Sequence, residues 1–228
     1  MGKSRKNKKI VLIVLLLLVV GLSIGFADFT RTLSIQSSSA NVSIAASDED
    51  FYIVFSSTPD KIENGKPMFS GDATENTDSS NPITLEGNTI KNLSATLSAR
   101  GQKATWTFYA RNEGNYEAYL KSVIFNNVEN EDAFIVGTKN EGTTQSYVDR
   151  AVENLKLTVT SGTDSYDSKT GSKTDINDAT PIAIDGYETI TVTLEYLSTD
   201  SEGNPSFLAD GDFTVEIGNI NLGYSSVQ

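Results

Sequence analysis

The sequence predicts an all-β protein, an antiparallel β-sandwich or jelly roll of eight to ten strands with one short helix. Apolar and polar residues alternate with a period of two in several segments, and clusters of turn-forming residues separate these segments. There is no cysteine, so stability must come from a buried core instead of disulfides. About 200 residues are enough to form such a core.

The first half of the chain contains several predicted strands. Residues 29–35 and 51–55 alternate as half-buried strands do, and residues 42–44 indicate another strand between them. The apolar pattern resumes less regularly over residues 83–97. Two short strands around the turn at Gly87-Asn88 are expected there.

The clearest strand covers residues 104–111, where Trp106, Phe108 and Ala110 share one face. The polar residues 112–115 supply a turn, and residues 116–125 resume the alternation. This second run places four residues on one face: Ala118, Leu120, Ser122 and Ile124. The pattern predicts a hairpin with a four-residue loop.

The remaining elements are one helix and three strands. Apolar residues near helical spacing predict a short amphipathic helix within residues 143–154. Strands are predicted at residues 155–159, 189–196 and 213–217, and the last of them is expected to continue towards Tyr224.

Residues 28–228 are expected to form a single β-sandwich domain with two polar insertions, near residues 56–82 and 161–180. Both segments are rich in residues that favour turns, and the first contains three prolines, which interrupt strand pairing.

Residues 1–27 have the order of an export signal. Five basic residues lie within the first nine positions, and an apolar run from Ile10 to Val20 follows them. Small residues then favour cleavage between Ala27 and Asp28. The alternative is an uncleaved membrane anchor formed by residues 10–27. Both alternatives predict that the rest of the chain is extracellular or at the cell surface.

The predicted exported part is strongly acidic. All 30 acidic residues follow the cut but only 13 of the 18 basic ones do, which leaves a charge of −17. Such a surface repels nucleic acid and anionic lipid, so no nucleic-acid partner is expected. Contact with a membrane is expected only through residues 10–27, if they are not removed.

The chain has no histidine, which argues against most catalytic schemes that use a serine or cysteine nucleophile and against zinc-protease sites. No phosphate-binding glycine loop is present either. Carboxylate pairs are the remaining enzyme-like feature, with candidates in Glu188 with Glu195 and Asp210 with Asp212. We interpret them as chance pairs among many acids and predict no catalytic or cofactor-binding residue.

Calcium is the one cofactor that oxygen-rich loops could bind. The candidate loops lack the D-x-[DN]-x-[DN]-G pattern, so solvated loops are the favoured interpretation and no metal ligand is assigned; they cover residues 48–50, 129–132, 164–178 and 200–204. Trp106 is in phase with Phe108, which predicts core packing instead of ligand stacking. Tyr109, Tyr116 and Tyr119 are candidates for facing a partner.

Several of these features together resemble secreted Gram-positive bacterial proteins typified by the biofilm matrix protein TasA and by camelysin, which a dedicated signal peptidase processes. The matching features are the basic and apolar start, Gly25 to Ala27 followed by Phe29, and the strand at Leu33-Ser-Ile35. Further matches are Asn92-Leu-Ser with Gly101-Gln, the stretch from Trp106 to Gly114, and the closing segment from Phe213 to Tyr224.

The resemblance implies a jelly-roll domain and a role in surface fibres or the extracellular matrix. In such fibres an N-terminal strand inserts into the next subunit by β-augmentation. Carried over to this chain, the strand-exchange residues are Phe29, Arg31, Leu33 and Ile35, which cleavage before Asp28 would free. The expected partners are further copies, other cell-surface proteins and, during export, the signal peptidase.

Three functions therefore remain open. The favoured one is a non-enzymatic exported surface or matrix protein that assembles by strand exchange. The second is a monomeric, membrane-anchored binding or adhesion module. The third is a metal-dependent hydrolase, since camelysin-like proteins are sometimes classed as metallopeptidases, and the missing histidines argue against it.

Overall fold

The computed structural model describes residues 30–36, 51–63, 66–75, 84–86, 89–91, 93–128, 131–218 and 220–226, and for 30–36, 84–86 and 89–91 it describes the backbone. The predicted signal or anchor at 1–27, the cut before Asp28 and the strand at 42–44 lie outside these residues. None of the helical structure within them is long and apolar enough to cross a membrane.

The described residues form strands and one short helix, so the predicted all-β class is confirmed. The helix, α2 (Gln145–Val152), lies within the predicted range. The strands are β1 (Thr30–Gln36), β2 (Ile53–Ser56), β3 (Met68–Gly71), β4 (Thr74–Glu75), β5 (Thr84–Glu86), β6 (Thr89–Lys91), β7 (Ser94–Leu97), β8 (Lys103–Asn112), β9 (Tyr119–Phe125), β10 (Ile135–Lys139), β11 (Leu155–Ser161), β12 (Asp164–Asp167), β13 (Tyr187–Tyr196), β14 (Phe213–Ile217) and β15 (Ile220–Ser225).

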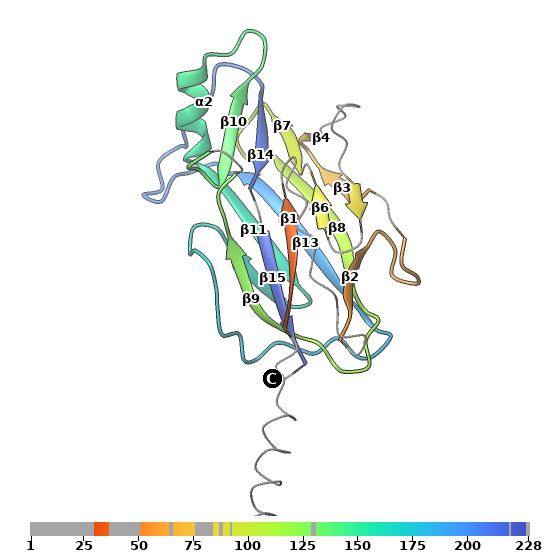
Figure 1. The fold of residues 1–228 in the computed structure, drawn as a ribbon. Helices are drawn as coiled ribbons and strands as arrows, with labels where there is room; N and C mark the ends of the chain where they lie inside the picture. The colour runs from red at the N-terminus through yellow and green to blue at the C-terminus, as the bar shows by residue number, and fades with distance from the viewer. Residues whose placement is uncertain are drawn as a thin grey trace, which may run out of the picture.

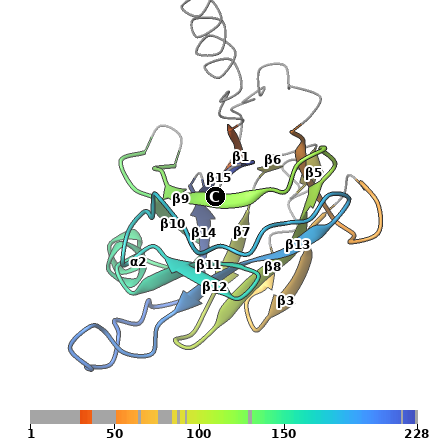
Figure 2. The same ribbon diagram turned by 90° about the horizontal axis from the view of Figure 1, so that it is seen from below.

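The strands form three sheets arranged as a sandwich. The six-stranded sheet has the order β12-β11-β13-β8-β2, with β3 also paired to β8. The second layer contains the five-stranded sheet β5-β6-β1-β15-β9 and the four-stranded sheet β10-β14-β7-β4. Figure 2 shows the five-stranded sheet above the six-stranded one. The pairings are antiparallel except for β1 with β6. Jelly-roll topology stays a prediction.

The core lies between the two layers and follows from the alternation in the sequence. Inward residues of β8 and β13 alternate with half-buried or exposed ones, and Trp106, Phe108 and Val192 are fully buried. Leu222 and Val215 close the core from the other layer. The prediction that Trp106 packs in the core is confirmed.

The predicted hairpin of residues 104–125 is wrong. Strand β8 pairs with β13, β2 and β3, whereas β9 pairs with β15 in the other layer. After β8 the chain crosses between the layers, and Ala118 there forms an isolated bridge with Ile182. Alternation indicates that each segment is a strand, but it does not choose the partner.

The faces of β9 also differ from the prediction. The register opposite β15 shifts because Ser122 pairs with Gly223 while Leu120 pairs with Tyr224, which leaves Lys121 as an extra residue. This bulge reverses the alternation, so Leu120 and Val123 are buried while Ile124 is half-buried.

The predicted strand from Phe213 to Tyr224 is two strands. Strand β14 pairs with β10 and β7, and β15 pairs with β1 and β9. Gly218 separates them, and its amide donates to the Phe134 carbonyl at 2.7 Å. The chain thus moves from the four-stranded to the five-stranded sheet within one layer (Figure 1).

Both predicted insertions contain strands. The first includes β3 and β4, and the second includes β12, which forms a hairpin with β11. Their strands are short and polar, which is why the sequence signal is weak. Strand β10 was not predicted, because Gly137 interrupts its apolar pattern. A Cβ at Gly137 would lie 2.5 Å from a Val152 methyl of α2, so glycine lets the helix pack closely.

Candidate functional site

The candidate site begins at the seam between β1 and β15, where the predicted strand-exchange segment lies. The antiparallel register pairs Arg31 with Tyr224, Leu33 with Leu222 and Ile35 with Ile220. These three residues of β15 are buried, so β15 carries a continuous apolar row beside β1. Phe29 lies outside the described residues.

On its other side β1 pairs in parallel with β6, from Ser34 with Thr89 to Gln36 with Lys91. Strand β1 therefore lies inside the five-stranded sheet, between β15 and β6 (Figure 1). Its removal would leave the backbone amide and carbonyl groups of β15 without their partners on that side.

A polar cluster inside the sandwich lies next to this seam. Glu188 of β13 lies in phase with the inward residues of that strand. The Ser161 hydroxyl of β11 donates to the Glu188 Oε2 at 2.6 Å. The Tyr224 hydroxyl, from β15 in the opposite layer, is fully buried beside this pair, close enough that both Ser161 and Glu188 act on its pKa. The cluster thus lies where β11 and β13 of the six-stranded sheet face β15, the strand that pairs with β1.

Burial is the dominant electrostatic effect in this cluster. Burial raises the pKa of Glu188; the Ser161 hydrogen bond opposes the shift, and the nearby Asp164 adds to it. Burial also raises the pKa of Tyr166 to about 12, with further contributions from Asp164, Asp178 and Glu188. Burial is also the main reason that the pKa of Tyr224 rises well above its usual value. Both tyrosines stay neutral near pH 7, and Glu188 is the group that titrates most readily.

We expect Glu188 to make stability depend on pH. A carboxyl whose folded-state pKa is raised stabilises the fold fully below its unfolded pKa, and the contribution is lost as pH rises through the folded pKa. Glu188→Gln keeps a neutral acceptor for Ser161. Its melting temperature should match the wild type near pH 4 and exceed it by a few degrees near pH 8, since ~1 kcal/mol shifts a domain of this size by ~2–4 °C.

The measurement is thermal unfolding followed by circular dichroism from pH 4 to pH 8. Glu195→Gln is the matched control, because Glu195 lies on the outer face of the same strand and pairs with Lys103 at 3.1 Å. A gain for Glu188→Gln that does not change with pH would contradict the prediction.

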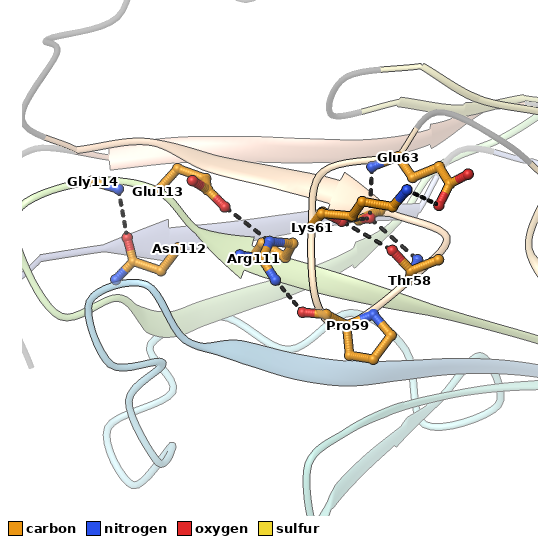
Figure 3. Close-up of polar contacts among 9 residues, drawn as sticks. Thr58, Pro59, Lys61, Glu63, Arg111, Asn112, Glu113 and Gly114 are labelled. Atoms are coloured by element: carbon orange, nitrogen blue, oxygen red, sulfur yellow. Dashed lines mark hydrogen bonds and ion pairs between the residues drawn. The ribbon is translucent and has the colours of Figure 1, made fainter.

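The Asn112-Glu-Gly114 motif forms a buried turn at the end of β8. The Asn112 amide donates to the carbonyls of Tyr116 at 2.7 Å and Ile182 at 3.0 Å, and its oxygen accepts from the Gly114 amide at 3.1 Å. Figure 3 shows Asn112 beside Gly114. Both polar atoms of this side chain, through three hydrogen bonds, hold the chain where it crosses between the layers, so the motif has a structural role.

Arg111, the preceding residue, holds a second loop in place. Its Nε donates to Glu113 at 2.8 Å, and its Nη1 donates to the Pro59 carbonyl, as Figure 3 shows. The loop after β2 is closed further by Ser56, whose hydroxyl donates to the Lys61 carbonyl and accepts from the Glu63 amide. Arg111 is 8% exposed, so its guanidinium group contacts Glu113 and Pro59 inside the protein and is largely shielded from solvent.

Glu188 and Glu195, the first candidate carboxylate pair, lie on opposite faces of β13, and Asp210 of the second pair accepts hydrogen bonds from Thr144. Glu188 points inward and Glu195 outward, because they are an odd number of positions, seven, apart on one strand. The Asp210 carboxylate accepts from the Thr144 amide at 3.0 Å and the Thr144 hydroxyl at 2.7 Å. These bonds lower the pKa of Asp210 and fix the start of α2. The Asp212 carbonyl accepts from Thr143.

The acidic loops make local hydrogen bonds in the part of the chain that the structure describes. Asp167 accepts from the amides of Lys169 and Thr170, and Asp200 accepts from those of Glu202 and Asn204. Within these residues no three Asp or Glu side chains gather as a metal site would require. Residues 48–50 and 129–130 lie outside them, and calcium binding stays a prediction.

The candidate tyrosines differ in exposure. Tyr116 is 46% exposed, whereas Tyr109 and Tyr119 are half-buried. Tyr109 packs edge-on against Tyr187, a residue that was not predicted to face a partner.

The cluster of Ser161, Glu188 and Tyr224 was not predicted from the sequence either. Glu188 is in phase with Ile190 and Val192, and this spacing was the available signal.

Neither the family models, the curated proteins nor the solved structures contain a match to this chain. The fold and the seam define a class by themselves: a β-sandwich whose first described strand is paired in the middle of a sheet. The resemblance to the TasA and camelysin group remains a prediction.

Proposed function

We propose that this chain is a non-enzymatic exported protein of the cell surface or extracellular matrix that assembles by exchanging its N-terminal strand between copies. The observation that carries the proposal is the place of β1, which starts three residues after Ala27 and pairs over six positions with β15. A copy that released β1 would expose the edge of β15, and the same strand of another copy could fill it in the same register.

Two further features support exchange. Fourteen residues, 37–50, join β1 to Phe51, and a connection of this length gives the strand room to reach a neighbour. The pairing uses main-chain groups, so an identical strand supplied by another copy satisfies the same donors and acceptors. The basic N-terminus and the apolar run that follows it support export.

Cysteine cross-linking tests strand exchange directly, because the chain has no cysteine of its own. Ser34 of β1 is the register partner of Asn221 in β15. Opposed residues of antiparallel strands have Cα atoms ~4.5–5.5 Å apart, within the range of a disulfide. Ser34→Cys and Asn221→Cys are made in separate chains that begin at Asp28, then unfolded, mixed and refolded with an oxidant.

Exchange predicts a disulfide-linked dimer that joins Cys at position 34 of one chain to Cys at position 221 of the other, identified by mass spectrometry. Ser34→Cys mixed with Ser201→Cys is the control, since Ser201 lies in an exposed loop. If the dimer yield equals the control, while the double variant cross-links within one chain, exchange is excluded.

Cross-linking only within one chain, with a dimer yield equal to the control, favours the other candidate. This is a monomeric surface module anchored through residues 10–27. The observation favouring this candidate is that β1 is paired within its own chain. The two functions therefore give opposite cross-linking patterns from the same pair of variants.

A further inference from the structure

The outer face of the six-stranded sheet carries a regular array of threonines. Strands β8, β13 and β11 each contribute two, in the rows Thr107–Thr191–Thr160 and Thr105–Thr193–Thr158. We call these six residues the threonine face. Neighbouring strands are ~4.8 Å apart and alternate residues ~6.8 Å apart, so the hydroxyls form a two-dimensional grid. The six-stranded sheet is the lower layer in Figure 2.

The threonine face is rigid and accessible. The residues between these threonines, including Trp106, Val159 and Val192, are fully buried in the core. All six threonines are half-buried, so their hydroxyl and methyl groups reach the surface. Branching at Cβ restricts their rotamers. The Thr105 and Thr193 hydroxyls lie 3.2 Å apart, which fixes one pair further.

An aromatic pair extends the face at one end. Tyr109 and Tyr187 have ring centroids 5.5 Å apart at 87°, and Tyr187 is 51% exposed. Thr189, which is exposed, lies opposite Tyr109 in the register. From Tyr187 to Thr193 the strip runs along seven residues of β13, or ~20 Å.

The strip is uncharged on a chain with 30 acidic residues. Its nine residues are seven threonines and two tyrosines, with no acidic or basic side chain among them. At one end lies the row Lys103–Glu195–Lys156, in which Lys103 is 3.1 Å from Glu195, and at the other end Arg111 is 2.8 Å from Glu113. At the side, Asp167 lies opposite Thr158, and its carboxylate accepts from the amides of Lys169 and Thr170. An anionic polymer is repelled by the rest of the surface, and a cationic one finds no free acid on the strip.

We propose that the threonine face, with Tyr109, Tyr187 and Thr189, binds an extended, neutral, β-1,4-linked polysaccharide. The C–H faces of the sugar rings pack on the tyrosines, and the sugar hydroxyls exchange hydrogen bonds with the threonines, which both donate and accept. An extended, ribbon-shaped glycan matches a strip that follows one strand. This function is independent of strand exchange, because β1 lies in the other layer.

Affinity electrophoresis of the full chain in mild detergent tests the proposal. Native gels contain hydroxyethylcellulose, glucomannan or galactomannan, and alginate serves as the anionic comparison. The wild type should be retarded by at least one neutral polymer and not by alginate. Tyr187→Ala and the double variant Thr107→Val/Thr191→Val should each weaken binding about five-fold or more.

The controls repeat the same changes elsewhere. Thr96→Val alters a half-buried threonine of the four-stranded sheet, and Tyr147→Ala removes a tyrosine of α2 that is 43% exposed. Both should bind as the wild type does. Valine favours strands and keeps the shape of threonine, so the double variant should fold, which circular dichroism checks.

Three results would overturn the proposal. One is no retardation in any neutral gel, and another is equal retardation of the wild type and the strip variants. The third is a dimer in sedimentation experiments that Thr191→Lys dissociates, which would assign the face to contact between copies.

Discussion

Replacing Trp106 by alanine is expected to destabilise the protein by about 3–5 kcal/mol, the cost of removing a large buried aromatic side chain. Trp106 is fully buried in the centre of β8 and packs edge-on against Phe69 at 5.8 Å between ring centroids. A loss of this size lowers the melting temperature of a domain of this length by about 10 °C. Urea unfolding followed by circular dichroism measures it, because the variant has no tryptophan to report by fluorescence.

Trp106→Phe is the matched comparison. The Trp106 indole N–H is buried without an acceptor among the described residues, so phenylalanine removes an unsatisfied donor while it keeps much of the packing. We expect less than half the loss seen with alanine. An equal loss in the two variants would show that the indole N–H makes a hydrogen bond.

Replacing Asn112 by alanine is expected to cost about 3 kcal/mol or more. The change removes three hydrogen bonds: the Gly114 amide and the Tyr116 carbonyl lose the partner that Asn112 supplies, and the Ile182 carbonyl keeps the Ala118 amide alone. Each buried polar group left unsatisfied costs ~1–3 kcal/mol. Asn112→Asp should be as damaging, because it keeps the acceptor for Gly114 but turns a negative charge towards two carbonyl oxygens.

The same urea experiment measures this effect. Asn127→Ala is the control, since Asn127 is exposed and lies in the segment after β9. A loss within 1 kcal/mol of that control would contradict the structural role assigned to the Asn112-Glu-Gly114 motif.

The sequence predicts the strand β1 of the candidate site, but it predicts neither the partner of β1 nor the Glu188 cluster. The strand at residues 29–35 is predicted by alternation, and the structure describes β1 over nearly the same residues. Its partner, β15, is almost 190 residues away in the chain, and no local pattern identifies it. The Glu188 cluster depends on the same long-range pairing, since Ser161 and Tyr224 come from two other strands.

The threonine face illustrates the same distinction. Each pair of threonines is visible in the sequence as two alternate positions of a strand. They become a grid only because β11, β13 and β8 are neighbours in register. The hairpin prediction for residues 104–125 failed for the converse reason, since a short polar segment between two strands can also carry the chain across a sandwich.

Local patterns in the sequence were enough to predict the all-β class, the inward residues of β8, the short helix, and a chain without imidazole or thiol chemistry. These are properties of local spacing and side-chain type, which each segment carries wherever it packs. The tertiary structure alone decided which strands pair, where β9 bulges, and which polar residues meet inside the sandwich. Those choices depend on packing between segments far apart in the chain, where the total buried surface selects one pairing among several that satisfy the same alternation.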